Sequence, residues 1–138
     1  MNDNANDTIY AVATPPGRSA VAVIRISGGN AAKIPVLFSV SCPPAGQFNV
    51  SRLMQAEKVL DQVILLFMQG PHSSTGEDVC EIHCHGSQAV IDFVLGKLAK
   101  TSGFRLAGPG EFTRRSFLNG KTDLSGVEGL ADLIDAQT

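Results

Sequence analysis

The sequence predicts an α/β (α+β) domain in which a mixed sheet is packed with helices. Three apolar, β-branched segments at 20–27, 63–68 and 79–85 are bounded by turn residues and are too short for helices, which favours buried strands. Residues 87–100 instead repeat their apolar positions at helical spacing. This irregular mixture of strands and helices indicates an α+β or α/β layer structure, and 138 residues suffice for one such domain.

Turn and capping residues define the remaining elements. We expect a strand over 8–14, a short helix over 31–38, a helix ending at Leu118 and a last helix capped by Asp123. Loops are expected over 41–51 and 70–76, where proline and glycine cluster. Residues 1–7 are polar and are expected to form a disordered tail.

Composition and charge argue against several classes of protein. The chain has 11 Lys and Arg against 13 Asp and Glu, a net charge of −2, which argues against broad non-specific DNA binding. No apolar segment approaches the roughly 20 residues of a membrane span. Three cysteines leave a disulfide framework incomplete, and the first residues resemble no targeting signal. We therefore expect a cytoplasmic protein without membrane contact.

Arg25 is a charge inside an apolar strand, between Ile24 and Ile26. Strand alternation places it on the same face as Val21 and Val23. An unpaired buried charge is costly, so Arg25 must be paired, reach water at a sheet edge, or face a cleft. A structural ion pair and a ligand site both remain open.

The strand at 79–85 carries a second unusual charge, Glu81. Alternation predicts one polar face and one small apolar face: Val79, Glu81, His83 and His85 on the first, Cys80, Ile82 and Cys84 on the second. The polar face is either solvated or the wall of a site. In a site, the carboxylate of Glu81 would suit a ligand edge with two parallel N–H donors.

Two apparent motifs are rejected on geometry. Cysteines and histidines of the strand at 79–85 point to opposite faces, which argues against a zinc site or a Cys–His nucleophile. Gly120-Lys121-Thr122 imitates the end of a phosphate-binding P-loop, but Arg115 stands where that motif needs its first glycine. The chain is therefore not expected to bind or hydrolyse GTP, and Lys121 remains as a lone cation between two helices.

Three separate stretches together resemble the N-terminal domain of the MnmE (TrmE) family of tRNA modification GTPases. They contain the segments ATPPGR (13–18) with IRISG (24–28), TGEDV (75–79), and PGEFT (109–113) with FLNGK (117–121). The resemblance extends from about Thr8 to the end of the chain. It implies a folate-binding and dimerisation domain over 8–122, with 123–138 starting the family's helical domain. The family's G domain, with its GTP, magnesium and potassium, has no counterpart here.

The resemblance also implies a ligand, a site and partners. The fold would be similar to the tetrahydrofolate-binding domain of glycine-cleavage aminomethyltransferase. Formyl- or methylene-tetrahydrofolate would contact Arg25, Glu81 and Lys121, the positions that match the family's folate contacts. A homodimer would work with the flavoprotein MnmG to add a carboxymethylaminomethyl or aminomethyl group to the wobble uridine of tRNA. A stand-alone one-carbon transferase and a dimerisation module without ligand are the alternatives.

Overall fold

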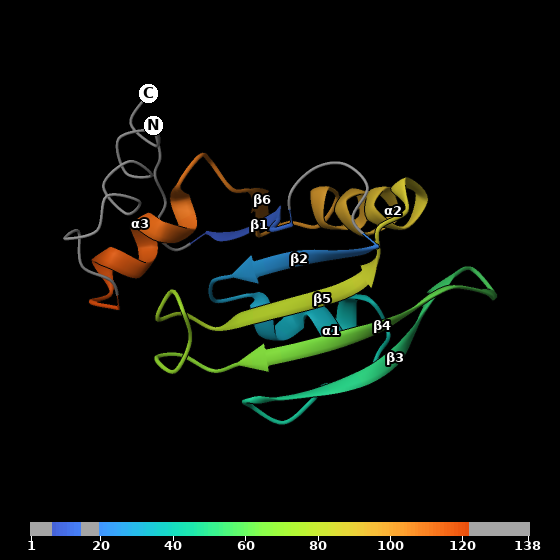
Figure 1. Ribbon diagram of the computed structural model, residues 1–138, viewed down its shortest axis with the longest axis horizontal. Coiled ribbons are helices and arrows are strands. Elements are labelled where there is room, and N and C mark those ends of the chain that lie inside the picture. Colours follow the sequence, from blue (N-terminus) through green and yellow to red (C-terminus); the bar gives the residue numbers. More distant parts are fainter. Residues whose placement is uncertain (1–6, 15–19, 122–138) are drawn as a thin grey trace.

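The computed structural model describes residues 7–14 and 20–121, which form one six-stranded sheet packed with helices (Figure 1). The strand order is β3-β4-β5-β2-β1-β6. Neighbouring strands are antiparallel except β1 and β6, which are parallel, so the sheet is mixed as the sequence predicts. The elements are, in order, β1 (Thr8–Val12), β2 (Val21–Ser27), η1 (Ala31–Lys33), α1 (Ile34–Leu37), β3 (Gln47–Gln55), β4 (Lys58–Met68), β5 (Val79–His85), α2 (Gln88–Ala99), β6 (Phe104–Leu106) and α3 (Glu111–Leu118).

The hydrophobic core lies between one face of the sheet and the helices α1 and α2 (Figure 1). The predicted alternation is confirmed over most of β2 and β5, where every second side chain is buried and the intervening ones are more exposed; the exceptions are Ser27 and Val79, which are paired with each other and buried. The largest part of the core comes from the sheet's inner face and from α1 and α2: Ala22, Ile24, Ile26, Val63, Leu65, Phe67, Cys80, Ile82, Ile34, Val90, Val94 and Leu98. The opposite face of the sheet is left without a covering helix over β3 and β4 (Figure 1).

The predicted helix over 87–100 is confirmed as α2. The Ser87 hydroxyl accepts a hydrogen bond from the Val90 amide at 3.3 Å and so caps the helix start. Val90, Val94 and Leu98 form its buried stripe. The predicted end of α3 at Leu118 is also confirmed.

Several predicted boundaries are wrong. The loop expected over 41–51 is strand β3 from Gln47 onward, β4 begins at Lys58 instead of 63, and β6 was not predicted. The helix expected over 31–38 is a 3₁₀ turn followed by a single α-helical turn with Pro35 at its start. Asp7, assigned to the tail, accepts a hydrogen bond from Arg105. The rest of the tail and the helix after Asp123 lie outside the described residues.

None of the helices within 7–14 and 20–121 has the length and apolar character needed to cross a membrane.

Candidate functional site

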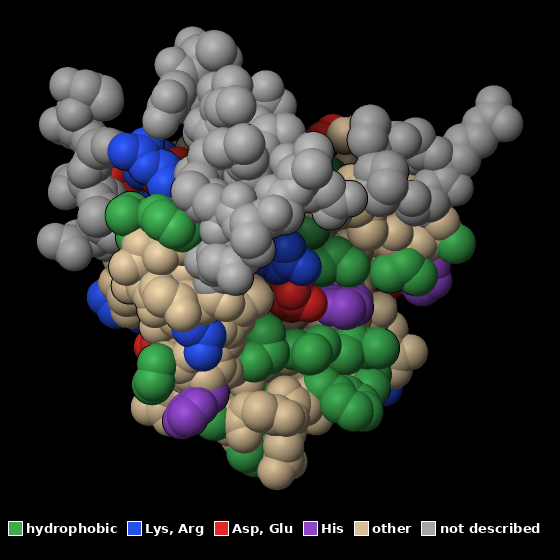
Figure 2. Space-filling model, turned by 60° about the vertical axis from the view of Figure 1, so that its left-hand side comes forward, with side chains coloured by type: hydrophobic (Ala, Val, Ile, Leu, Met, Phe, Trp, Pro, Cys, Tyr) green, Lys and Arg blue, Asp and Glu red, His purple; other side chains and the backbone are tan. Residues whose placement is uncertain are grey.

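The candidate site lies on the face of the sheet opposite α1 and α2, which we call the outer face. Its central row runs across the strands, with Arg25 on β2 directly opposite Glu81 on β5, and Leu66 on β4 opposite Glu81. Ala11 on β1 pairs with Arg25 at the other end of the row. Figure 2 shows a basic, an acidic and a histidine side chain together beside a group of hydrophobic side chains. The two sequence anomalies, Arg25 and Glu81, therefore meet on one face.

The Glu81 carboxylate is held on both of its oxygens. Arg25 donates from Nε to Oε2 at 2.8 Å, and His83 Nε2 lies 2.9 Å from Oε1. The Glu81 side chain is only 14% exposed, whereas Arg25 and His83 are 34% and 29% exposed. Burial raises the pKa of Glu81, but the hydrogen bonds and charges of His83 and Arg25 outweigh burial and hold that pKa below its usual value. The centre of the outer face therefore carries an ionised carboxylate.

Helix α3 brings an aromatic side chain to this pair. The guanidinium of Arg25 lies 6.0 Å from the ring centroid of Phe112. Arg25 uses only its Nε in the hydrogen bonds found among the described residues, which leaves its terminal N–H groups available to another acceptor. Arg25, Glu81 and Phe112 thus present a cation, an anion and an apolar ring close together.

Lys121, the third predicted site residue, is exposed at the end of α3. Its backbone amide donates to the Ser116 carbonyl, and its side chain lies near Gly76, where an added Cβ would come 3.4 Å from Lys121 Cγ. No hydrogen bond joins Lys121 to Arg25 or Glu81 within the described part of the chain. The structure therefore brings together two of the three predicted residues and places Lys121 on a neighbouring loop.

The close approach of Gly76 to α3 explains a glycine in the TGEDV segment. Gly76 has φ of +83°, and a Cβ there would come 2.7 Å from Cβ of Asn119. Asn119 also donates from its side-chain nitrogen to the Thr75 carbonyl at 2.8 Å. The hydrogen bond joins the loop between β4 and β5 to the segment that carries Lys121, and the close approach leaves no room for a side chain at residue 76.

Sequence reasoning missed a network of ion pairs around the buried Arg115 that fixes α3. Arg115 is 5% exposed and donates to Glu77 at 3.1 Å and to Glu111 at 3.3 Å. Arg105 also donates to Glu111 through both terminal nitrogens, at 2.9 and 2.7 Å. Burial raises the pKa of Glu111. The hydrogen bonds from Arg105 and Gly108 and the charges of Arg105 and Arg115 lower that pKa by more than burial raises it, so its net value is below the usual one.

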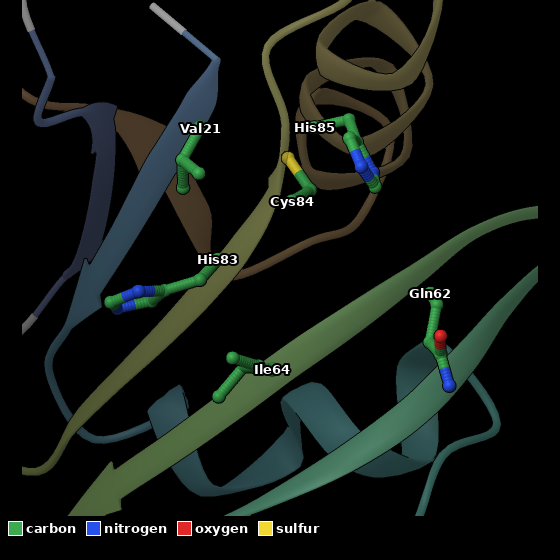
Figure 3. A pocket seen from close by; sticks show the side chains of 6 residues that line it. All are labelled: Val21, Gln62, Ile64, His83, Cys84 and His85. Atoms are coloured by element: carbon green, nitrogen blue, oxygen red, sulfur yellow. The ribbon is translucent and has the colours of Figure 1, made fainter.

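A pocket of about 310 Å³ opens on the outer face and is lined in part by His83, the hydrogen-bond partner of Glu81 (Figure 3). Its walls come from β2, β4 and β5: Val21, Gln62, Ile64, His83, Cys84 and His85. Figure 3 shows the His83 ring directed toward β2 and the His85 ring directed away from it. His85 Nδ1 instead lies 2.5 Å from Asp61. The two histidines therefore do not converge, and no group of three potential metal ligands occurs among the residues described.

The cysteines of β5 lie on the buried face, as alternation predicts. Burial raises the pKa of Cys80 to about 12 and that of Cys84 to about 11. Neither thiol is activated as a nucleophile at neutral pH, because nucleophilic attack requires the thiolate.

The fold and this site define an α+β domain with helices packed on a mixed sheet and an ion-paired arginine and glutamate on the outer face of that sheet. Residues 8–121 match the family described as GTP-binding protein TrmE N-terminus, and the chain belongs to this family.

Proteins called tRNA modification GTPase MnmE are similar along nearly the whole chain. The relative from Nitrosomonas eutropha is 48% identical over 136 residues, covering 96% of this chain and 30% of its own length. Those from Cereibacter sphaeroides and Erwinia tasmaniensis are 49% and 43% identical, covering 96% and 98% of this chain and 31% and 30% of their own length. The chain thus spans about 30% of the length of these relatives and corresponds to their N-terminal region.

Proposed function

We propose that this chain is the tetrahydrofolate-binding and dimerisation domain of a GTPase that modifies the wobble uridine of tRNA. The observation that carries the proposal is the ionised, largely buried Glu81 on the outer face of the sheet, paired to Arg25. The tRNA modification is taken from the names of the relatives. The folate, the homodimer and the flavoprotein partner MnmG come from the family resemblance.

The residues on the outer face fit the chemistry of a one-carbon folate. A pterin presents an amino group beside a ring N–H, and a carboxylate accepts two such parallel donors. Each Glu81 oxygen accepts one hydrogen bond within the described chain, so each keeps lone pairs for a ligand. The terminal nitrogens of Arg25 suit an acceptor on the pterin or on its formyl or methylene group. The exposed ammonium of Lys121 suits the carboxylates of the folate's glutamate tail.

The outer face also offers a surface for a second copy of the chain. Phe48 and Val50 on β3 are 62% and 56% exposed, and Ile64 on β4 is 38% exposed. These side chains are neighbours across the sheet, since Val50 pairs with Ile64 and Phe48 with Leu66. A contiguous apolar patch of this kind is typical of an interaction surface. A two-fold partner would cover it in both copies at once.

Calorimetric titration with formyl-tetrahydrofolate tests the proposed ligand. We expect one ligand bound per chain and a rise in melting temperature with ligand concentration, because a ligand that binds only the folded state stabilises it by mass action. Unchanged thermal stability and no heat of binding at saturating folate would reject a folate site and favour a dimerisation module without ligand.

A second measurement separates binding from catalysis. If the chain were a one-carbon transferase by itself, the purified chain would release the carbon unit from formyl- or methylene-tetrahydrofolate with turnover. We expect binding without turnover. A rate above that of a matched blank would favour the transferase.

A further inference from the structure

His83 lies between the central carboxylate and the pocket of the outer face. It follows Glu81 by two residues on β5 and therefore shares its face. Its Nε2 is 2.9 Å from Oε1 of Glu81, and its ring also lines the pocket of about 310 Å³ (Figure 3). The neighbouring positions on β2 and β4 are Val23 and Ile64, which are apolar and offer the imidazole no competing hydrogen bond.

The contact with Glu81 determines which nitrogen of His83 carries the proton. An ionised carboxylate only accepts hydrogen bonds, so Nε2 must be the donor. In the neutral ring Nδ1 is then an acceptor. Arg25 holds the other carboxylate oxygen through its Nε at 2.8 Å. Donors on both oxygens fix the plane of the Glu81 carboxylate, and removing one donor would weaken the restraint on its terminal torsion.

We propose that His83 is a positioning residue, which orients the Glu81 carboxylate toward a planar ligand that presents two adjacent N–H donors. The ligand half of this inference rests on the proposed function; the positioning of Glu81 does not. The lowered pKa of Glu81 supports it, because hydrogen bonding by His83 is among the causes that overcome the effect of burial. His83 would act through Glu81 and need not touch the ligand.

The ligand-free chain provides the first test. Nitrogen-15 NMR should find the neutral His83 ring protonated on Nε2. In a carboxyl titration by NMR, His83→Phe should raise the pKa of Glu81, while His83→Gln, whose amide can still donate, should restore most of the lowering. His72→Phe is the matched control, since His72 is an exposed loop residue and should leave Glu81 unchanged. Protonation on Nδ1, or a Glu81 pKa unmoved by His83→Phe, overturns the inference.

Calorimetry with formyl-tetrahydrofolate provides the second test. His83→Phe should weaken binding about tenfold, the effect of losing one charge-assisted hydrogen bond, while His83→Gln should stay within about threefold of wild type. Binding by His83→Phe equal to wild type, or by His83→Gln as weak as His83→Phe, overturns the positioning role. If the wild-type chain binds no folate, the proposed function and the ligand half of the inference both fail, and the NMR result alone decides whether His83 orients Glu81.

Discussion

Arg25 and Glu81 stand directly opposite each other on β2 and β5, joined by a 2.8 Å contact between Nε and Oε2. The sequence left two interpretations of Arg25 open, a structural ion pair and a residue facing a site. The structure supports the first and is compatible with the second, because the pair is partly exposed on the outer face and leaves the terminal nitrogens of Arg25 without a partner among the described residues. A ligand-binding experiment separates the two roles.

Replacing Glu81 by glutamine tests the pterin contact. The amide replaces one acceptor oxygen with a donor, which would meet the N–H edge of the ligand. Affinity for formyl-tetrahydrofolate should fall about 30- to 1000-fold, equivalent to roughly 2–4 kcal/mol. Glu57→Gln, on the exposed hairpin between β3 and β4, is the matched control and should bind like wild type. If Glu81→Gln binds the folate as tightly as wild type, the assignment of the pterin to Glu81 is wrong.

Lys121→Ala should weaken folate binding less than Glu81→Gln. Lys121 is exposed, and an exposed ion pair contributes about 0.2–1 kcal/mol, so the expected loss is at most about fivefold. The loss should shrink further as salt is added, because screening weakens exposed pairs. Titrations at low and high salt measure both effects, with Lys100→Ala at the end of α2 as the control. A larger loss for Lys121→Ala than for Glu81→Gln would reverse the proposed order.

Alternation alone predicted the face of Arg25 and of Glu81, because a strand buried on one side obeys a period of two. It could not predict that the two residues meet, since this depends on β2 and β5 being neighbours in the sheet. Strand β3 was missed because QFNVSRLMQ is a largely exposed edge strand with no continuous apolar signal. Strand β6 has only three residues, too few for a sequence pattern, and it is defined by its parallel pairing with β1.

The ion pairs around α3 could not be predicted for a related reason. In the sequence, Arg115 is notable only as the residue that breaks a P-loop pattern, and a local pattern does not show that an arginine will be 5% exposed. Its partner Glu77 lies 38 residues earlier in the chain. Only the folded arrangement brings these charges together, which makes them suitable targets for stability measurements.

Arg115→Ala should strongly destabilise the fold. Arg115 is a buried donor to two carboxylates, and although Glu111 keeps Arg105 and Glu77 keeps the Ser27 hydroxyl, losing the charge-assisted hydrogen bonds of Arg115 should cost about 1.5–3 kcal/mol in the free energy of unfolding. Glu77 and Glu111 would both lose a donor. Arg114 is the adjacent exposed arginine on α3, and Arg114→Ala should change stability by no more than about 0.5 kcal/mol. Urea unfolding of both variants measures the difference, and equal stabilities would contradict a structural role for the network.

Acid should weaken the same network through Glu111. Its folded-state pKa lies below the reference value of 4.5, so the folded state stabilises the ionised form. This contribution is fully present above pH 4.5 and is lost as the pH falls through the lower folded-state pKa, because the unfolded chain binds the proton more readily. The free energy of unfolding should therefore decrease below pH 4.5, and Glu111→Gln should flatten that decrease. An unchanged slope in Glu111→Gln would assign the acid sensitivity to other carboxylates.

Phe48→Asp tests the proposed dimer surface. Phe48 is 62% exposed on β3, the strand at one edge of the described sheet, and it lies beside the other apolar side chains of the outer face. A carboxylate there would be desolvated in a packed interface but would remain hydrated in a monomer, so the substitution should disfavour association without disturbing the core. Light scattering at micromolar concentration should report about twice the chain mass for wild type and one chain mass for Phe48→Asp.

The helical side of the sheet supplies the control for this experiment. Val36 is 83% exposed on α1, so Val36→Asp introduces the same charge at an exposed apolar residue on the opposite face of the molecule. We expect Val36→Asp to keep the mass of two chains. Dissociation by Val36→Asp but not by Phe48→Asp would move the interface to the helices. A wild-type chain with the mass of one copy at these concentrations would contradict dimerisation by this domain alone.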